Sequence, residues 1–193
     1  NGSNPAITIF KKSCIIDGVE TGLYPVMIWI SPTRLDIHFD DEVRKAALWF
    51  GCEVNYEIDR RTDFYRYFCK ENCQAFLTWT PKIMMNPLKR NKQIEYGSRS
   101  GDPFQLAQML QISKLWADGD DRENYNGHIH RCKFKVLIEQ GLHYNHLDRT
   151  KSDLWVSLQM ALVPVFGDMQ IPVKIQSGTP KMLLPQYKIR MVS

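Results

Sequence analysis

The stretch DDEVRKAALWFGCEVNYEID, residues 40–59, decides the expected fold because its apolar period changes part-way along. The first half places apolar residues at i, i+3, i+4 and i+7, between aspartates that suit an N-cap and a glycine that suits the C′ position. These apolar residues are Val43, Ala46, Ala47 and Phe50. After Gly51, apolar residues alternate with polar ones, as in a half-buried strand. The stretch predicts an amphipathic helix at about 41–50, followed directly by a strand.

A second amphipathic helix is predicted at about 103–117. Asp102 offers an N-cap, Pro103 occupies the first helical position, and Asp118-Gly119 ends the helix. Its inner face carries Leu106, Met109, Leu110, Ser113 and Trp116.

The remaining segments favour strands. Alternation predicts strands at 128–140 and 154–162, Gly167-Asp168 fits a hairpin turn, and a last strand at 187–192 would close the sheet. The aromatic stretch 64–68 also reads as extended. We therefore expect an α+β fold, mostly antiparallel β-sheet or a sandwich-like domain with two amphipathic helices. Residues 1–193 would form one β-rich domain with a long basic loop at about 80–101.

Composition limits the class of protein. The chain has 193 residues, 44% of them hydrophobic, and no apolar run approaches the roughly 18 residues that a transmembrane helix needs. Five cysteines cannot all pair within one chain, which favours a reducing compartment. We expect an intracellular protein, cytoplasmic or nuclear, and a virion also fits this composition.

Cations and aromatic rings gather in two segments. Residues 60–70 interleave arginines with rings, and residues 82–99 are basic, although the net charge of the chain is only +4. Cations bind phosphates and flat rings stack on bases, so these segments predict a nucleic-acid-binding surface. Its residues would be Arg60, Arg61, Phe64, Tyr65, Arg66, Tyr67, Lys82, Lys89, Arg90, Lys92 and Arg99. The alternative is a strand whose rings pack into the core.

The leading hypothesis is a non-enzymatic binding and assembly protein that contacts RNA or DNA and copies of itself. Viral coat and matrix proteins share this make-up by class analogy only. The apolar tip Ile83–Met85 beside basic residues also suits a partner subunit or peripheral contact with an anionic membrane. The alternative is that the methionines fold back on the core. A module that sequesters another protein is a further alternative.

A structural zinc site is a weaker hypothesis, and we expect no other cofactor. His128, His130 and Cys132 lie two apart in a predicted strand, so all three would project from one face. Cys69 and Cys73 could complete a tetrahedral set. The alternative is a strand whose end enters the core.

The segment His128-Ile129-His130 also resembles the His-hydrophobe-His motif of rolling-circle replication nucleases. The stretch Phe-Leu-Thr at 76–78 resembles the first motif of that family. The resemblance implies a metal-dependent endonuclease with His128 and His130 as metal ligands. The family also needs a nucleophilic tyrosine on a later helix; here Tyr144 follows His130 by only fourteen residues, and Tyr187 lies in a predicted strand.

Overall fold

The computed structural model describes residues 4–33, 37–59, 63–86, 95–120, 125–148 and 151–167. Helices and short antiparallel strand pairs are mixed within them, which confirms the α+β class. Both predicted amphipathic helices are present, as α1 (Phe39–Phe50) and α3 (Pro103–Asp118). The described strands pair two by two, so the sandwich-like arrangement stays a prediction.

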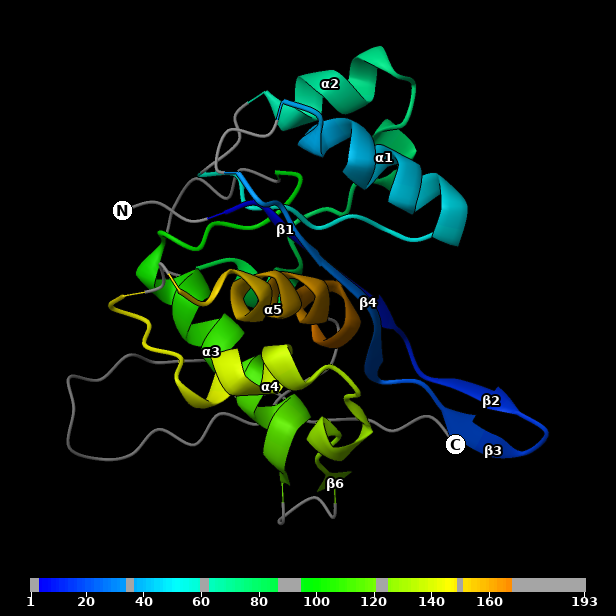
Figure 1. Cartoon of the computed structure of the whole chain (residues 1–193), viewed down its shortest axis with the longest axis vertical. Helices are drawn as coiled ribbons and strands as arrows, with labels where there is room; N and C mark the ends of the chain where they lie inside the picture. Colours follow the sequence, from blue (N-terminus) through cyan, green and yellow to red (C-terminus); the bar gives the residue numbers. More distant parts are fainter. Residues whose placement is uncertain are drawn as a thin grey trace.

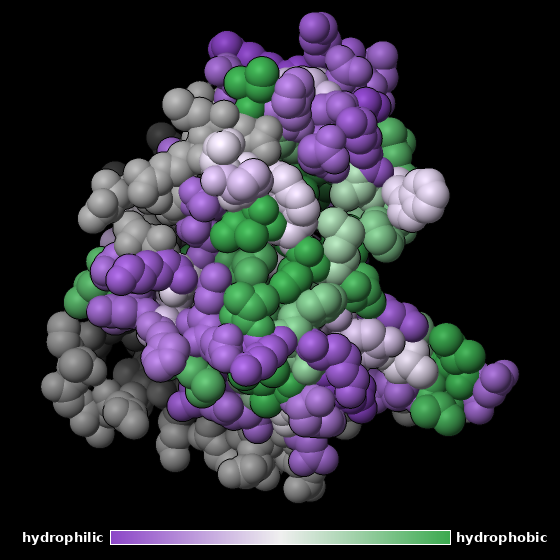
Figure 2. Space-filling view, in the orientation of Figure 1, coloured by the Kyte–Doolittle hydropathy of each residue, from purple (hydrophilic) through white to green (hydrophobic). Residues whose placement is uncertain are grey.

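A twisted two-stranded ribbon runs through the middle of the molecule (Figure 1). It consists of β1 (Ala6–Lys11) and the antiparallel β4 (Tyr24–Ile30), with a bulge after Ile9. Between them the chain forms a hairpin of β2 (Cys14–Ile16) and β3 (Val19–Thr21), which projects from the body. Ile15, Ile16 and Val19 are exposed on this hairpin, and Figure 2 shows the apolar surface that they form.

The first apolar cluster packs on one face of the ribbon, against Ala6, Phe10 and Ile28. Its helices are α3, α4 (Lys135–Leu142) and α5 (Asp153–Phe166). Trp116 of α3 is fully buried there, and its indole N–H donates to the Leu23 carbonyl at 2.8 Å. The short pair β5 (Gly119–Asp120) and β6 (Tyr125–Asn126) follows α3.

The second apolar cluster packs on the opposite face of the ribbon, against Ile7 and Trp29. Its helices are α1 and α2 (Phe64–Lys70), and it includes the fully buried Phe68. The 3-10 turns η1 (Gln74–Phe76) and η2 (Lys82–Met84) follow α2. The ribbon therefore separates two cores: Ala6 and Phe10 of β1 contact the first, and Ile7 contacts the second.

Three of the predicted strands are wrong, because each segment is largely helical. Residues 154–162 lie in α5, residues 64–68 lie in α2, and residues 128–140 contain the 3-10 turn η4 (Ile129–Arg131) and most of α4. The α5 segment is apolar on nearly all sides, so its residues fit a period of two as well as a buried helix. In α2, Phe64 and Phe68 stand four apart, a spacing that serves one helix face as well as one strand face.

The predicted strand after α1 is extended but is not part of a regular sheet. Val54 forms an isolated parallel bridge with Leu77, and Glu57 forms another with Ser98. In the long loop, Ile83 and Met84 are buried in the first cluster. The expected exposed apolar tip is therefore wrong for these two residues, and the alternative, in which the segment folds back on the core, describes them. The predicted hairpin strand after Gly167 and the strand at 187–192 lie outside the described residues.

Candidate nucleic-acid interface

Three aromatic side chains from distant parts of the chain form a stack at the surface. The Tyr96 ring lies 3.8 Å from the Trp79 ring and 5.3 Å from the Tyr65 ring, centroid to centroid, with interplanar angles of 25° and 22°. Trp79 is 53% exposed and Tyr65 is 40% exposed. The indole of Trp79 therefore contacts Tyr96 on one face and presents much of its remaining surface to solvent. We call these three residues the ring stack.

Backbone pairing holds Trp79 against Tyr96. The two residues form an antiparallel bridge, flanked by hydrogen bonds from the Thr80 amide to the Glu95 carbonyl and from the Gly97 amide to the Thr78 carbonyl, at 2.8 and 2.9 Å. The buried Thr80 hydroxyl lies 2.9 and 2.7 Å from the Glu95 and Gly97 carbonyl oxygens. These contacts fix the ring stack before any ligand arrives, which lowers the entropic cost of binding.

A glycine is required next to Tyr96. Gly97 has a φ of +84°, and a Cβ built there would lie 2.6 Å from the backbone oxygen of Tyr56. Only glycine accommodates both the left-handed backbone and this close approach.

Tyr65 is held on α2 with its hydroxyl near a thiol. A hydrogen bond with Cys69 raises the pKa of Tyr65 above its ordinary value, with the charge of Cys69 and burial acting in the same direction. The phenol therefore stays neutral over a wider pH range than an ordinary tyrosine.

The predicted aromatic residues divide between surface and core. Phe64 is 1% exposed and lies within the second cluster, so its assignment to the nucleic-acid surface is wrong. Tyr67 is half-buried, and its hydroxyl donates to an Asp41 carboxylate oxygen at 2.9 Å. Of the three predicted aromatic residues, Tyr65 alone belongs to the ring stack.

The predicted cations differ in whether they already contact carboxylates of the same chain. Arg99 contacts two carboxylates, at 2.8 Å to Glu95 and 3.1 Å to Asp59, which leaves it poorly placed to bind a phosphate. Burial lowers the pKa of Arg99, but the hydrogen bonds and charge of Glu95 outweigh it, so the net shift is upward. Arg66 has an 83% exposed side chain and a loose 3.4 Å contact with Asp63, and Lys82 is exposed.

The other five predicted cations lie outside the described residues. They are Arg60, Arg61, Lys89, Arg90 and Lys92. In the sequence, Arg61 precedes Tyr65 by four residues and Lys92 precedes Tyr96 by four.

The proposed zinc ligands are not brought together. Among the described residues, no three His, Cys, Asp or Glu side chains form a group that could hold a metal ion. Cys73 is buried in the second cluster and Cys132 in the first, on opposite sides of the ribbon. Burial raises the pKa of the Cys132 thiol, which favours the protonated form that does not bind zinc. The strand geometry on which the zinc hypothesis relied is absent from this segment.

The nuclease-like motif has a geometry different from the one expected. His128 precedes a 3-10 turn that contains His130, and their ring centroids are 6.5 Å apart. His128 is buried, whereas His130 is exposed. The two imidazoles are thus not presented side by side from one strand.

Trp79 and Tyr96 are functional candidates that the sequence reasoning missed. Trp79 stands between two threonines, and Tyr96 stands beside Gly97, without apolar periodicity around either residue. A bulky ring with polar neighbours was the available signal for an exposed position.

No protein-family model, curated protein or solved structure matches this chain. The described helices include none that combines the length and the apolar character needed to cross a membrane.

Proposed function

We propose that the chain binds single-stranded nucleic acid, with the ring stack as the platform on which bases stack. The observation that carries the proposal is the outer surface of Trp79, which is 53% exposed while the indole is held 3.8 Å from Tyr96. Stacking on an aromatic ring contributes about 1–3 kcal/mol per base and tolerates any base. A rigid, exposed and stacked tryptophan meets this requirement.

Cations on both sides of the ring stack would hold the phosphates. The basic segment at 60–61 leads into α2 and Tyr65, and the basic segment at 89–92 leads into Tyr96. Arg66 and Lys82 add exposed charge within the described residues. Charge near stacked rings is the usual composition of a groove for single strands.

Binding of a labelled twelve-nucleotide single-stranded RNA at low salt tests the proposal. We expect Trp79→Ala to weaken binding by about 5- to 150-fold, the equivalent of one lost stacking contact. Leu147→Ala is the control, because Leu147 is also an exposed apolar side chain, at 84%, and belongs neither to the ring stack nor to the surfaces proposed for self-association. No binding by the wild-type chain, or equal losses in the two variants, would refute the ring stack as the platform.

Self-association is the second part of the proposed function. Exposed apolar side chains gather on the projecting hairpin and at the end of α1. They are Ile15, Ile16 and Val19 on the hairpin, and Leu48, Trp49 and Phe50 on α1. Exposed apolar groups of this kind favour contact with another protein surface. Light scattering should show a mass that rises with concentration and falls in Ile15→Ser; a strict monomer would favour a module that binds a different protein.

A further inference from the structure

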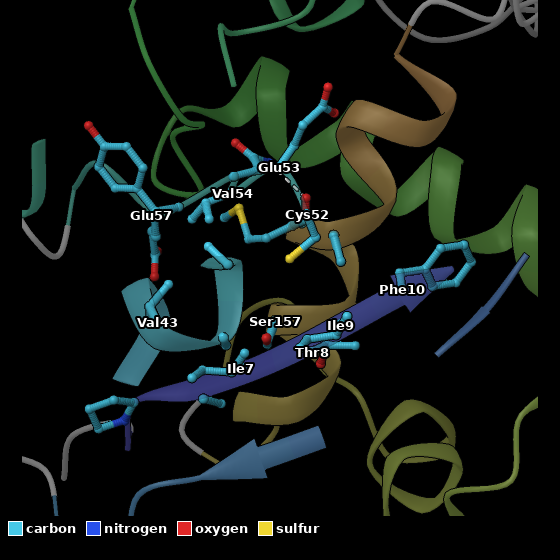
Figure 3. A pocket seen from close by; sticks show the side chains of 18 of the residues that line it. Ile7, Thr8, Ile9, Phe10, Val43, Cys52, Glu53, Val54, Glu57 and Ser157 are labelled. Atoms are coloured by element: carbon cyan, nitrogen blue, oxygen red, sulfur yellow. Dashed lines mark hydrogen bonds between the residues drawn. The ribbon is translucent and has the colours of Figure 1, made fainter. Parts of the chain in front are cut away.

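A cleft of about 950 Å³ opens between the two cores, along the ribbon (Figure 3). Its walls are α1 with residues 51–57 on one side and α5 on the other. Residues of β1, from Ala6 to Phe10, line it throughout. The three residues of the ring stack are not part of its lining.

The edge of β1 that borders the cleft has no neighbouring strand in the described part of the chain. The Ser31 amide donates to the Pro5 carbonyl at 2.8 Å, so in antiparallel alternation Ile7 and Ile9 also bond to β4. Ala6 and Thr8 then direct their amide and carbonyl groups away from β4. Open strand edges of this kind accept an added strand.

The side chain of Thr8 is a second sign of an incomplete site. Thr8 lines the cleft, and its hydroxyl oxygen is buried without a hydrogen-bond partner among the described residues. Buried hydroxyls in folded proteins nearly always have a partner. An additional segment along β1 could supply one.

The lining of the cleft indicates the chemistry of the missing segment. Aliphatic side chains cover its floor, and its charged residues are five carboxylates and one lysine. The carboxylates are Asp40, Glu53, Glu57, Asp63 and Asp153, and the lysine is Lys12. Lys12 pairs with Glu53 at 2.7 Å, so the lining as a whole keeps a negative charge. A segment with alternating apolar and cationic residues would match both the aliphatic floor and this charge.

The end of the chain has this composition. After Asp168 the sequence contains Lys174, Lys181, Lys188 and Arg190 but no acidic side chain. Within residues 187–192, Tyr187, Ile189 and Met191 alternate with Lys188 and Arg190.

The position at which α5 ends also favours the chain's own terminus. Pro164 and Val165, in the last turn of α5, line the cleft. The twenty residues from Gly167 to Tyr187 can span up to about 70 Å, which is ample to return to β1. A segment attached at the edge of the cleft is present there at high effective concentration.

We propose that Tyr187–Val192 of the same chain adds to β1 as a strand that fills this cleft. The ribbon would become a three-stranded sheet, the smallest sheet that is commonly stable on its own. Lys188 and Arg190 would pair with the carboxylates of the cleft.

Amide hydrogen exchange of Ala6 and Thr8, followed by NMR, tests this proposal. We expect both amides to exchange about tenfold faster or more in a chain that stops after Gln186, because they lose their partners. The amides of Ile7 and Ile9 bond to β4 and serve as internal controls. Ile189→Pro in the full chain should give the same result, because proline cannot donate to a strand pair.

A peptide of residues 185–193 added to the shortened chain should restore protection, whereas the same peptide with Lys188→Glu and Arg190→Glu should not. Equal exchange of Ala6 and Thr8 in the full chain, the shortened chain and Ile189→Pro would overturn the proposal. Protection that depends on protein concentration would also overturn it, because the strand would then come from a second copy. Neither result bears on binding of single-stranded RNA.

Discussion

The side-chain amide of Asn55 donates a hydrogen bond of 2.7 Å to the backbone carbonyl of Met160. In a regular helix this carbonyl would accept from the residue four positions later, but that residue is Pro164, which has no N–H. Asn55 therefore replaces the donor that the proline removes. The bond also ties the extended segment after α1 to α5 across the cleft.

We expect Asn55→Ala to lower the free energy of unfolding by about 1–3 kcal/mol, because it leaves a buried carbonyl without a donor. Pro164→Ala restores a backbone donor, so the double variant should lose less than Asn55→Ala alone. Urea unfolding of the wild-type chain, both single variants and the double variant gives the coupling energy. If the losses in unfolding free energy of the two single variants simply add in the double variant, the Asn55 amide does not replace the N–H that Pro164 lacks.

Gly97→Ala should destabilise the chain more than Gly18→Ala. Both glycines have positive φ, at +84° and +78°, so alanine strains the backbone by about 1 kcal/mol or more at each. At Gly97 the added Cβ would also meet the Tyr56 carbonyl, whereas nothing lies within 4 Å at Gly18. Urea unfolding measures the difference, and nucleic-acid binding should fall only in Gly97→Ala because Tyr96 would shift.

The salt dependence of RNA binding should separate the cations from the ring stack. Replacing Lys89, Arg90 and Lys92 with glutamine should reduce the slope of log affinity against log salt by about 2, on the basis of roughly 0.7 per phosphate contact. Trp79→Ala should lower affinity at every salt concentration with the slope unchanged. Fluorescence titrations between about 50 and 300 mM salt would show whether the change in slope and the loss of affinity are separate.

Asp41 should contribute to stability at neutral pH and not in acid. Hydrogen bonds from Lys45, Arg44 and Tyr67, in that order of strength, hold the pKa of Asp41 well below its ordinary value of 3.8. A carboxyl whose pKa is lowered by folding stabilises the fold above the unfolded pKa, and the contribution is lost as the pH falls below it. Asp41→Asn should therefore destabilise the chain at pH 7, and the difference from wild type should shrink below about pH 4.

Asp63→Asn is the matched control for this pH dependence. Asp63 also pairs with an arginine three residues later, but at 3.4 Å and with both side chains more than 80% exposed. Exposed pairs of this kind contribute little. Thermal unfolding at several pH values should show a clear pH-dependent difference for Asp41→Asn and almost none for Asp63→Asn.

The helices with local end signals could be predicted from sequence, and those without them could not. Asp102 caps α3 through two backbone amides, at 2.9 and 3.2 Å, as its position before Pro103 predicts. The α5 segment was misassigned because apolar residues on all sides of a buried helix carry no period. Its internal Pro164 lies in the last turn of the helix.

The candidate site was predicted in part. Basic and aromatic composition singled out residues 60–70 and 82–99, which contain Tyr65 and Tyr96 of the ring stack, but only Tyr65 was among the predicted site residues. The pairing of Trp79 with Tyr96 is set by a backbone bridge between residues seventeen apart in sequence. Local periodicity contains no information about such a contact. The same limit explains why Phe64 was assigned to the surface instead of to the core.

Because a different core covers each face of the ribbon, its strands serve as a shared wall. A fragment that keeps the ribbon with α1 and α2 but lacks α5 would leave Ala6 and Phe10 in water, and the opposite fragment would leave Ile7 and Trp29 in water. We therefore expect neither half of the molecule to fold on its own. A shift of one residue in strand register would turn each set of side chains toward the other core. The register that packs one core correctly is therefore also the register that the other core needs.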